Sequence, residues 1–147
     1  MDFIQEQLFN NSKNIVKRNS KIIYYDCTNY FFEINEEDDL RKYGISKEHR
    51  PNPIVGMELF MDGDGIPLSF NIYPGNQNEQ KNLIPEESKI INDFKLDDTK
   101  VILCTDAGLA SAEIKKYNID DGRGFVITQS LKKIKEEYKE QIFDKKG

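Results

Sequence analysis

The sequence predicts a single α/β domain: a mixed sheet of about five strands, three in a meander and then two parallel, with helices packed on it. Three observations lead to this prediction. The length of 147 residues suits one domain with its own core. Strand-like runs fill the first half without a helical pattern between them. In the second half, helical patterns separate short apolar runs, which is typical of crossovers between parallel strands.

The chain begins with a segment, 1–20, whose apolar residues stand at roughly helical spacing. We interpret it as a lead-in helix, either the last piece of a preceding domain or a frayed terminus. The remainder, 21–147, forms the predicted domain. Its first strand is Lys21–Ile34, because this run is dense in aromatic and β-branched residues.

One aspartate interrupts this first strand. A period of two places Asp26 on the same face as Tyr24, Thr28, Tyr30 and Phe32. The aromatic residues predict that this face belongs to the core, which would bury Asp26 among them. An unpaired buried carboxylate costs several kcal/mol. Asp26 therefore calls for a metal ion, a cation or a cage of hydrogen bonds.

A charged run, 35–39, and a polar loop, Leu40–Pro53, follow the first strand. The loop carries basic side chains that include Lys47, His49 and Arg50. It is either a mobile surface connection or a contact to a nucleic-acid phosphate backbone. His49 is the single histidine and no cysteine pair lies near it, which argues against a zinc site.

The next segment, Ile54–Tyr73, reads as a hairpin around the turn DGDG. A calcium loop starting at Asp62 would need Gly and Glu where Pro67 and Tyr73 stand, so we exclude it. The same turn resembles the first motif of haloacid-dehalogenase-type phosphotransferases. That motif precedes a helix and has a hydroxyl side chain at the position of Ile66, whereas a strand follows here. A phosphotransferase using Asp62 stays open as an alternative.

A helix is predicted from Asn78 or Glu79 to Phe94, with Pro85 restarting it at a first turn. Glu79 is either a functional acid or a residue favoured by the helix dipole. A polar loop, Lys95–Lys100, comes next.

A buried strand, Val101–Asp106, then delivers Asp106 to the rim of the sheet, where ligands of α/β proteins bind. Ser111 is predicted to cap a helix of sequence AEIKKYN, and Phe125–Thr128 forms the last strand. Ser130 is predicted to cap one continuous final helix, 131–143.

Composition limits the classes of function. With 37% hydrophobic and 32% charged residues, no apolar run is long enough to span a membrane. No secretion signal is recognisable, so we expect a cytoplasmic protein in which Cys27 and Cys104 stay free thiols. The formal net charge of −5 is unusual for a protein that binds nucleic acid by itself. Any DNA contact must therefore be local or come from another segment.

The order of elements matches the ribonuclease-H-like arrangement. In that arrangement the first and fourth strands are neighbours, which would bring Asp26 and Asp106 together.

The runs YYDCTNYFFE, YGISKEHRPNPIVGMELFMDGDGIPLSFNIYPGNQNE, VILCTDAGLAS and GFVITQSLKK, in this order, carry a resemblance to a known family. Between about Ile22 and Lys133 the chain resembles the catalytic core of DDE-type transposases of bacterial insertion sequences, in the subfamily with a Tyr-Arg-Glu-Lys signature. The resemblance implies metal-dependent DNA cleavage and strand transfer at transposon ends. It also implies that Asp26 and Asp106 are the first two catalytic acids and ligands of Mg²⁺ or Mn²⁺. DNA would be the partner, and the full-length protein would act as a homo-oligomer.

The resemblance stops before the third acid of that family. Glu136, Glu137 and Glu140 lie in the final helix, but none has the expected Tyr-x-x-Arg-x-x-x-Glu context. We therefore expect a core truncated before this acid, with weak metal binding and little activity alone. An inactive relic of the fold, or an interaction module, remains the alternative.

Overall fold

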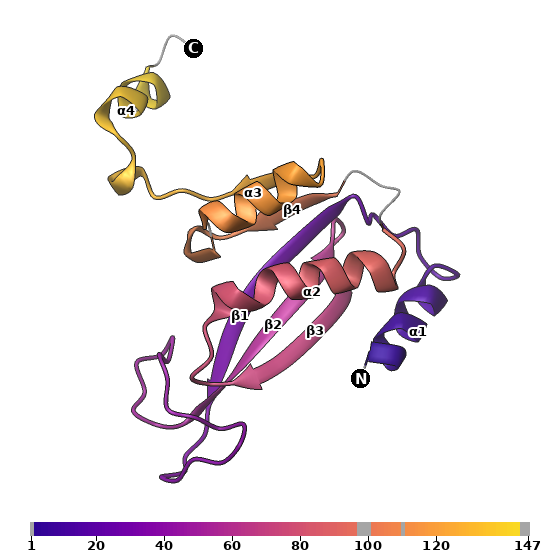
Figure 1. Cartoon of the computed structure of the whole chain (residues 1–147), viewed down its shortest axis with the longest axis vertical. Coiled ribbons are helices and arrows are strands. Elements are labelled where there is room, and N and C mark those ends of the chain that lie inside the picture. The colour runs from indigo at the N-terminus through magenta and orange to yellow at the C-terminus, as the bar shows by residue number, and fades with distance from the viewer. Residues whose placement is uncertain (1, 97–100, 110, 145–147) are drawn as a thin grey trace.

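The computed structural model describes residues 2–96, 101–109 and 111–144, so most of the predicted loop Lys95–Lys100 lies outside the described residues. Its centre is a five-stranded sheet of order β3-β2-β1-β4-β5 (Figure 1). β1 pairs antiparallel with β2, and β2 with β3, whereas β1–β4 and β4–β5 are parallel. The predicted ribonuclease-H-like mixed sheet is confirmed. The strands are β1 Ile22–Phe31, β2 Ile54–Asp62, β3 Pro67–Pro74, β4 Ile102–Thr105 and β5 Gly124–Ile127.

Helices connect the later strands and cover one face of the sheet. Figure 1 shows α2 and α3 in front of the sheet, α1 beside it, and α4 away from it. The connection from β4 to α3 contains a short 3-10 helix, η1, and a second one, η2, follows β5. The bounds are α1 Asp2–Ser12, α2 Glu79–Asp93, η1 Ala107–Leu109, α3 Ala112–Asp120, η2 Leu131–Lys133 and α4 Glu136–Phe143.

The hydrophobic core lies between the sheet and these helices. Alternation along β1 turns Ile23, Tyr25 and Cys27 into the core, as a period of two requires. α1 joins the core through Phe9, whose ring stacks on Phe94 with centroids 4.5 Å apart. The lead-in helix is therefore packed against the domain in this structure.

The opposite face of β1 is exposed, so our prediction that its aromatic residues belong to the core is wrong. Tyr24 is 41% exposed and Tyr30 is 55% exposed. The reason is that α2 and α3 pack on the other face, and no described helix covers this one. Neighbouring strands continue the same apolar surface, which we call the open face: Tyr24, Ile72, Ile102 and Val126.

Two helices differ from their predicted form. Pro85 lies inside one uninterrupted helix, α2, and does not restart it. The proline is exposed, and so is Lys81, the residue whose backbone carbonyl loses its helical partner. The predicted final helix divides into η2 and α4, because Ile134 and Lys135 have extended backbones. Ser130 makes no capping hydrogen bond through its side chain.

Candidate active site

The two predicted acids follow a pair of neighbouring parallel strands. In β1 and β4, Ile22 pairs with Ile102 and Tyr24 with Cys104. Asp26 and Asp106 each stand two residues beyond this last pair, and Asp106 directly follows β4. Adjacent strands are about 4.8 Å apart, so the two backbones meet at the same edge of the sheet.

Each of the two carboxylates is exposed and is held through one oxygen. Oδ1 of Asp26 accepts a hydrogen bond from the Cys27 amide at 2.8 Å. Oδ1 of Asp106 accepts from the amides of Gly108 at 3.0 Å and Leu109 at 3.2 Å. Among the described residues, neither Oδ2 atom has a hydrogen-bond donor. The expectation of a buried Asp26 is wrong, because this carboxylate stands on the open face.

No third acid joins the pair in the part of the chain that the structure describes. There, no group of three His, Cys, Asp or Glu side chains is placed to hold a metal ion. Glu136, Glu137 and Glu140 belong to α4, which extends away from the sheet (Figure 1). Carboxylate oxygens are the ligands that Mg²⁺ and Mn²⁺ prefer, so the donor type fits although the pair supplies only part of a shell.

The basic loop lies beside the carboxyl end of β1. Lys47 is the member that reaches the site, since its Nζ donates to the backbone carbonyl of Cys27, next to Asp26. Arg50 stands 5.0 Å from the centroid of the Phe31 ring and pairs weakly with Glu48 at 3.9 Å. His49 is exposed and has a positive φ of 55°. Of the three basic candidates, Lys47 is thus the one whose side chain contacts the residue next to Asp26.

Asp62 anchors the hairpin turn instead of facing solvent. Its side chain is fully buried, and Oδ2 accepts from Nε of Arg18 at 2.5 Å. Oδ1 accepts from the amides of Asp64 and Ile66. All of these contacts hold the turn together, which gives Asp62 a structural role.

Beneath the site lies a buried polar network on the core face of the sheet. The Tyr25 hydroxyl donates to Oε2 of Glu58 at 2.7 Å, and Nδ2 of Asn71 donates to Oε1 at 2.9 Å. The Cys27 thiol donates to the Tyr25 hydroxyl at 3.1 Å. Burial raises the pKa of the Cys27 thiol to about 11, so it stays protonated and unreactive at neutral pH. Both cysteines are free, as predicted, although Cys104 is only half-buried.

Sequence reasoning missed the contact that fixes the loop after β4. Nε2 of Gln80, in the first turn of α2, donates to the carbonyl of Gly108 at 2.7 Å. Gln80 directly follows PGNQNE, the run that carries part of the family resemblance. The unusual density of amide side chains in that run was the available signal. Glu79 stands in the same turn of α2, beside Gly108 in the wall of a cavity.

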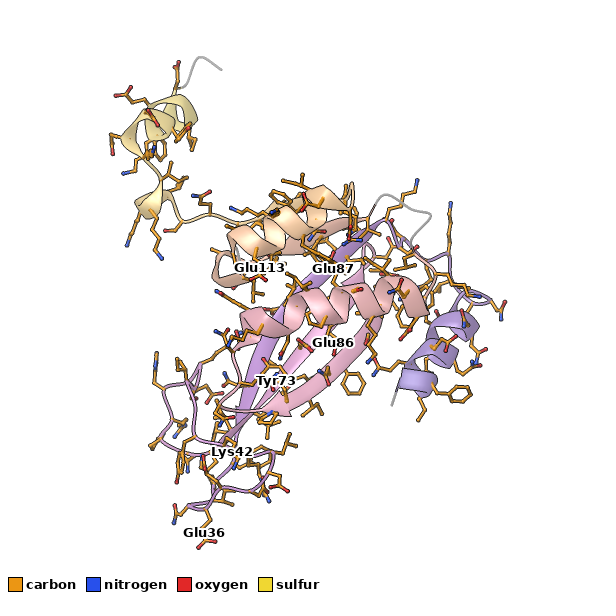
Figure 2. The ribbon with its side chains drawn as sticks, in the orientation of Figure 1. Glu36, Lys42, Tyr73, Glu86, Glu87 and Glu113 are labelled. Carbon is orange, nitrogen blue, oxygen red and sulfur yellow. The ribbon has the colours of Figure 1, made fainter. Side chains whose placement is uncertain are left out.

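A second buried cluster ties α2 to α3 away from the carboxylate pair. Glu87 on α2 is fully buried, and Figure 2 shows it on the side of α2 that faces α3. Its carboxylate lies 3.5 Å from Nε of Arg123 and accepts from Nδ2 of Asn118 at 3.2 Å. Burial raises the pKa of Glu87, and Arg123 opposes that shift. This cluster fixes the crossover that leads from β4 to β5.

The described helices include none that is long and apolar enough to cross a membrane.

Comparison with known proteins found similarity to solved structures but no match in sequence. No family model matches the chain, and no curated protein matches it in sequence. Among solved structures, it is similar to a Mos1 transposase paired-end complex with the left transposon end, with a TM-score of 0.51 and 10% identity over 82% of this chain. A piggyBac transposase synaptic complex with hairpin DNA has a TM-score of 0.52 and 15% identity over 81%. The Mos1 transposase catalytic domain with Raltegravir and Mn has a TM-score of 0.51 and 8% identity over 88%.

These solved structures are longer than this chain, which covers 39%, 25% and 60% of them in the same order. Identities this low establish a shared fold. The chain therefore has a ribonuclease-H-like fold that it shares with these transposase structures.

Proposed function

We propose that this chain is the catalytic core of a DNA transposase, which cleaves and transfers DNA strands at transposon ends in a metal-dependent reaction. The observation that supports the proposal is the parallel pairing of β1 with β4, whose last pair, Tyr24 with Cys104, lies two residues before both Asp26 and Asp106. The similar solved structures support it by fold. The finer assignment, to the bacterial insertion-sequence subfamily with a Tyr-Arg-Glu-Lys signature, rests on the sequence motifs.

Asp26 and Asp106 are proposed to hold a divalent cation through their Oδ2 atoms. Backbone amides fix the other oxygen of each carboxylate, so both side chains are oriented before an ion arrives. Mg²⁺ or Mn²⁺ at this position would activate a water or a 3′-hydroxyl and neutralise charge on the scissile phosphate. The exposure of both carboxylates leaves room for a DNA backbone to approach.

DNA binding is proposed to be local, because the net charge of −5 opposes a general attraction to DNA. Lys47 contacts the backbone next to Asp26 through the Cys27 carbonyl, and His49 and Arg50 belong to the same basic loop. The similar solved structures include paired-end and synaptic complexes, so we propose that the full-length protein also assembles on DNA.

The third carboxylate is proposed to come from a segment outside the described sheet. Two carboxylates give an incomplete ligand shell, so the affinity of this chain for metal should be weak and its activity low. The alternative of an inactive relic or interaction module is favoured by the same observation, because such a module needs no ion.

Titration with Mn²⁺, followed by amide NMR signals, separates these two functions. Paramagnetic broadening should appear first at Asp26, Cys27, Asp106 and Gly108. Asp26→Asn and Asp106→Asn should each weaken the Mn²⁺ affinity by at least ~10-fold, since losing even an indirect ligand contact has effects of that size.

Asp120→Asn is the matched control, because Asp120 is an exposed aspartate at the end of α3. It should leave the Mn²⁺ affinity unchanged. Broadening that spreads evenly over surface acids, or that survives both active-site substitutions, would favour the interaction module.

A further inference from the structure

A cavity of about 550 Å³ opens beside Gly108, two residues beyond Asp106. Its wall comes from the loop around Tyr43, from Gly56 and Tyr73 at the ends of β2 and β3, and from residues 75–80. Figure 2 shows Tyr73 at the end of the sheet that faces the loop holding Lys42. The volume lies within the range of about 300–1,000 Å³ that small-molecule sites occupy.

Amide side chains dominate the polar part of the lining. Asn76 is exposed and its side chain makes no hydrogen bond to any described residue. Gln77 and Gln80 each use their amide nitrogen, towards Asn82 at 2.6 Å and Gly108 at 2.7 Å, which leaves Oε1 as an acceptor. Carboxamides carry both donors and acceptors and match the edges of nucleobases.

One residue in the wall of the cavity is an exposed tyrosine, Tyr43, which two hydrogen bonds fix in place. The Tyr43 hydroxyl donates to the carbonyl of Asn35 at 2.8 Å, and its amide donates to Oε1 of Glu37 at 2.6 Å. These two contacts fix the residue at both ends while 48% of it stays exposed. A fixed and exposed aromatic ring is a platform on which a base can stack.

The same wall contains the buried hydroxyl of Tyr73. Tyr73 is only 4% exposed, yet its hydroxyl has no hydrogen-bond partner among the described residues. Burial raises the pKa of Tyr73, and the neighbouring Cys27 thiol adds to that shift, so the hydroxyl keeps its proton at neutral pH. The ring fits there because Gly56 has no side chain; a Cβ would come within 2.1 Å of it. This hydroxyl can therefore donate a hydrogen bond to an atom that enters the cavity.

We propose that this cavity binds one unstacked nucleobase of a DNA strand whose adjacent phosphate lies at Asp106. The identification of the strand as DNA rests on the proposed function. The binding of a base rests on the cavity itself. Gly108 borders both places, so one nucleotide can span them.

The charges of the wall favour a base over a free phosphate. Lys47 and Glu79 both line the cavity and offset each other, so the lining has little net charge. Glu79 can accept from an exocyclic amino group of a base. Lys47, held at the Cys27 carbonyl, lies where the phosphate would connect to the base.

Titration of the ¹⁵N-labelled full chain with deoxyribodinucleotides, in buffer free of divalent cations, tests the proposal. The four dinucleotides of identical bases serve as probes, each beside an analogue that lacks one base. At least one intact probe should shift the amide signals of residues 75–80 and of the loop around Tyr43. The abasic analogue should bind about tenfold more weakly, the scale of one lost stacking contact.

Asn76→Ala should weaken binding of that probe, and its exposed position leaves the fold intact. Asn92→Ala, which alters an exposed asparagine at the far end of α2, should have no effect. No shifts with any probe, or equal shifts with the abasic analogue, would overturn the proposal. Adding Mn²⁺ to the same sample reports on Asp26 and Asp106 separately, so failure of the cavity and failure of the metal site are distinguishable.

Discussion

At the scale of single residues, the most informative side chains are ionisable groups that the fold buries. Glu58 on β2 pairs with Cys27 of β1, is fully buried, and accepts two hydrogen bonds, from Tyr25 and Asn71. Burial nevertheless raises its pKa above the ordinary value of 4.5, and the two hydrogen bonds only oppose that shift. The fold therefore prefers Glu58 in its protonated form.

This preference predicts a pH dependence of stability. Because the folded-state pKa is raised, the contribution of Glu58 is complete below pH 4.5 and is lost as the pH rises through the folded-state pKa. Glu58→Gln imitates the protonated form, so its free energy of unfolding should rise relative to the native chain, by about 1.4 kcal/mol per pH unit within that window. Urea denaturation between pH 4.5 and 7 measures the difference.

Glu113→Gln provides the control for this experiment, since Glu113 is exposed on α3. Its stability should follow that of the native chain at every pH. If the difference between Glu58→Gln and the native chain stays constant with pH, burial of a charged Glu58 costs nothing and the argument fails.

At the scale of elements, α1 shows how a segment with a weak sequence pattern becomes part of the domain. Gln5 donates to the carbonyl of Phe70 at 3.0 Å and accepts from its amide at 2.8 Å, so the side chain pairs with β3 at the edge of the sheet. Phe9 enters the core against Phe94. An edge strand covered in this way is protected from pairing with other chains.

Substitution of the buried aromatic residue tests this docking. Phe9→Ala should lower the free energy of unfolding by about 3–5 kcal/mol, because Phe9 is 2% exposed and leaves a cavity against Phe94. Leu8→Ala, at a neighbouring position that is 65% exposed, should change it by less than about 0.5 kcal/mol. Chemical denaturation of both variants gives the comparison. Equal effects would show that α1 does not pack as described.

At the scale of the whole molecule, the domain is covered on one side only. The core face of the sheet has its helices, whereas the open face presents Tyr24, Ile72, Ile102 and Val126 to solvent. Asp26 stands on that face, beside Tyr24 in the strand, so the candidate site opens to the same side. α4 stands apart, and its apolar residues Tyr138, Ile142 and Phe143 are also more than half exposed.

Hydrogen exchange tests this picture of α4. A helix as short as Glu136–Phe143 is marginal without tertiary contacts, so its amides should exchange within about tenfold of the rate of an unstructured peptide. The amides of Leu83–Ile91 in α2 serve as the internal reference and should be strongly protected. Strong protection of α4 would mean that this helix packs against another surface in solution.

Much of the fold follows from local patterns in the sequence. The strands, the hairpin and the Ser111 cap were predictable, because a period of two, a Gly/Asp turn and a capping hydroxyl act over a few residues. The neighbourhood of β1 and β4, the strands that lead to Asp26 and Asp106, was also predictable, although only through the order of elements. That order limits a mixed sheet to few arrangements, and the observed register agrees with it.

Tertiary structure alone decided which face of each element is buried. A period of two separates Tyr24 from Tyr25 but says nothing about which side the helices cover, and both faces of β1 are rich in aromatic or apolar residues. The interruption of the final helix at Ile134 and the position of Pro85 inside α2 likewise depend on which backbone groups the assembled chain exposes to solvent. The cavity beside Gly108 joins segments that are distant in sequence, and no local pattern reports such a meeting. Local propensities therefore determined the elements, whereas burial, which is a property of the assembled chain, determined their faces and the site.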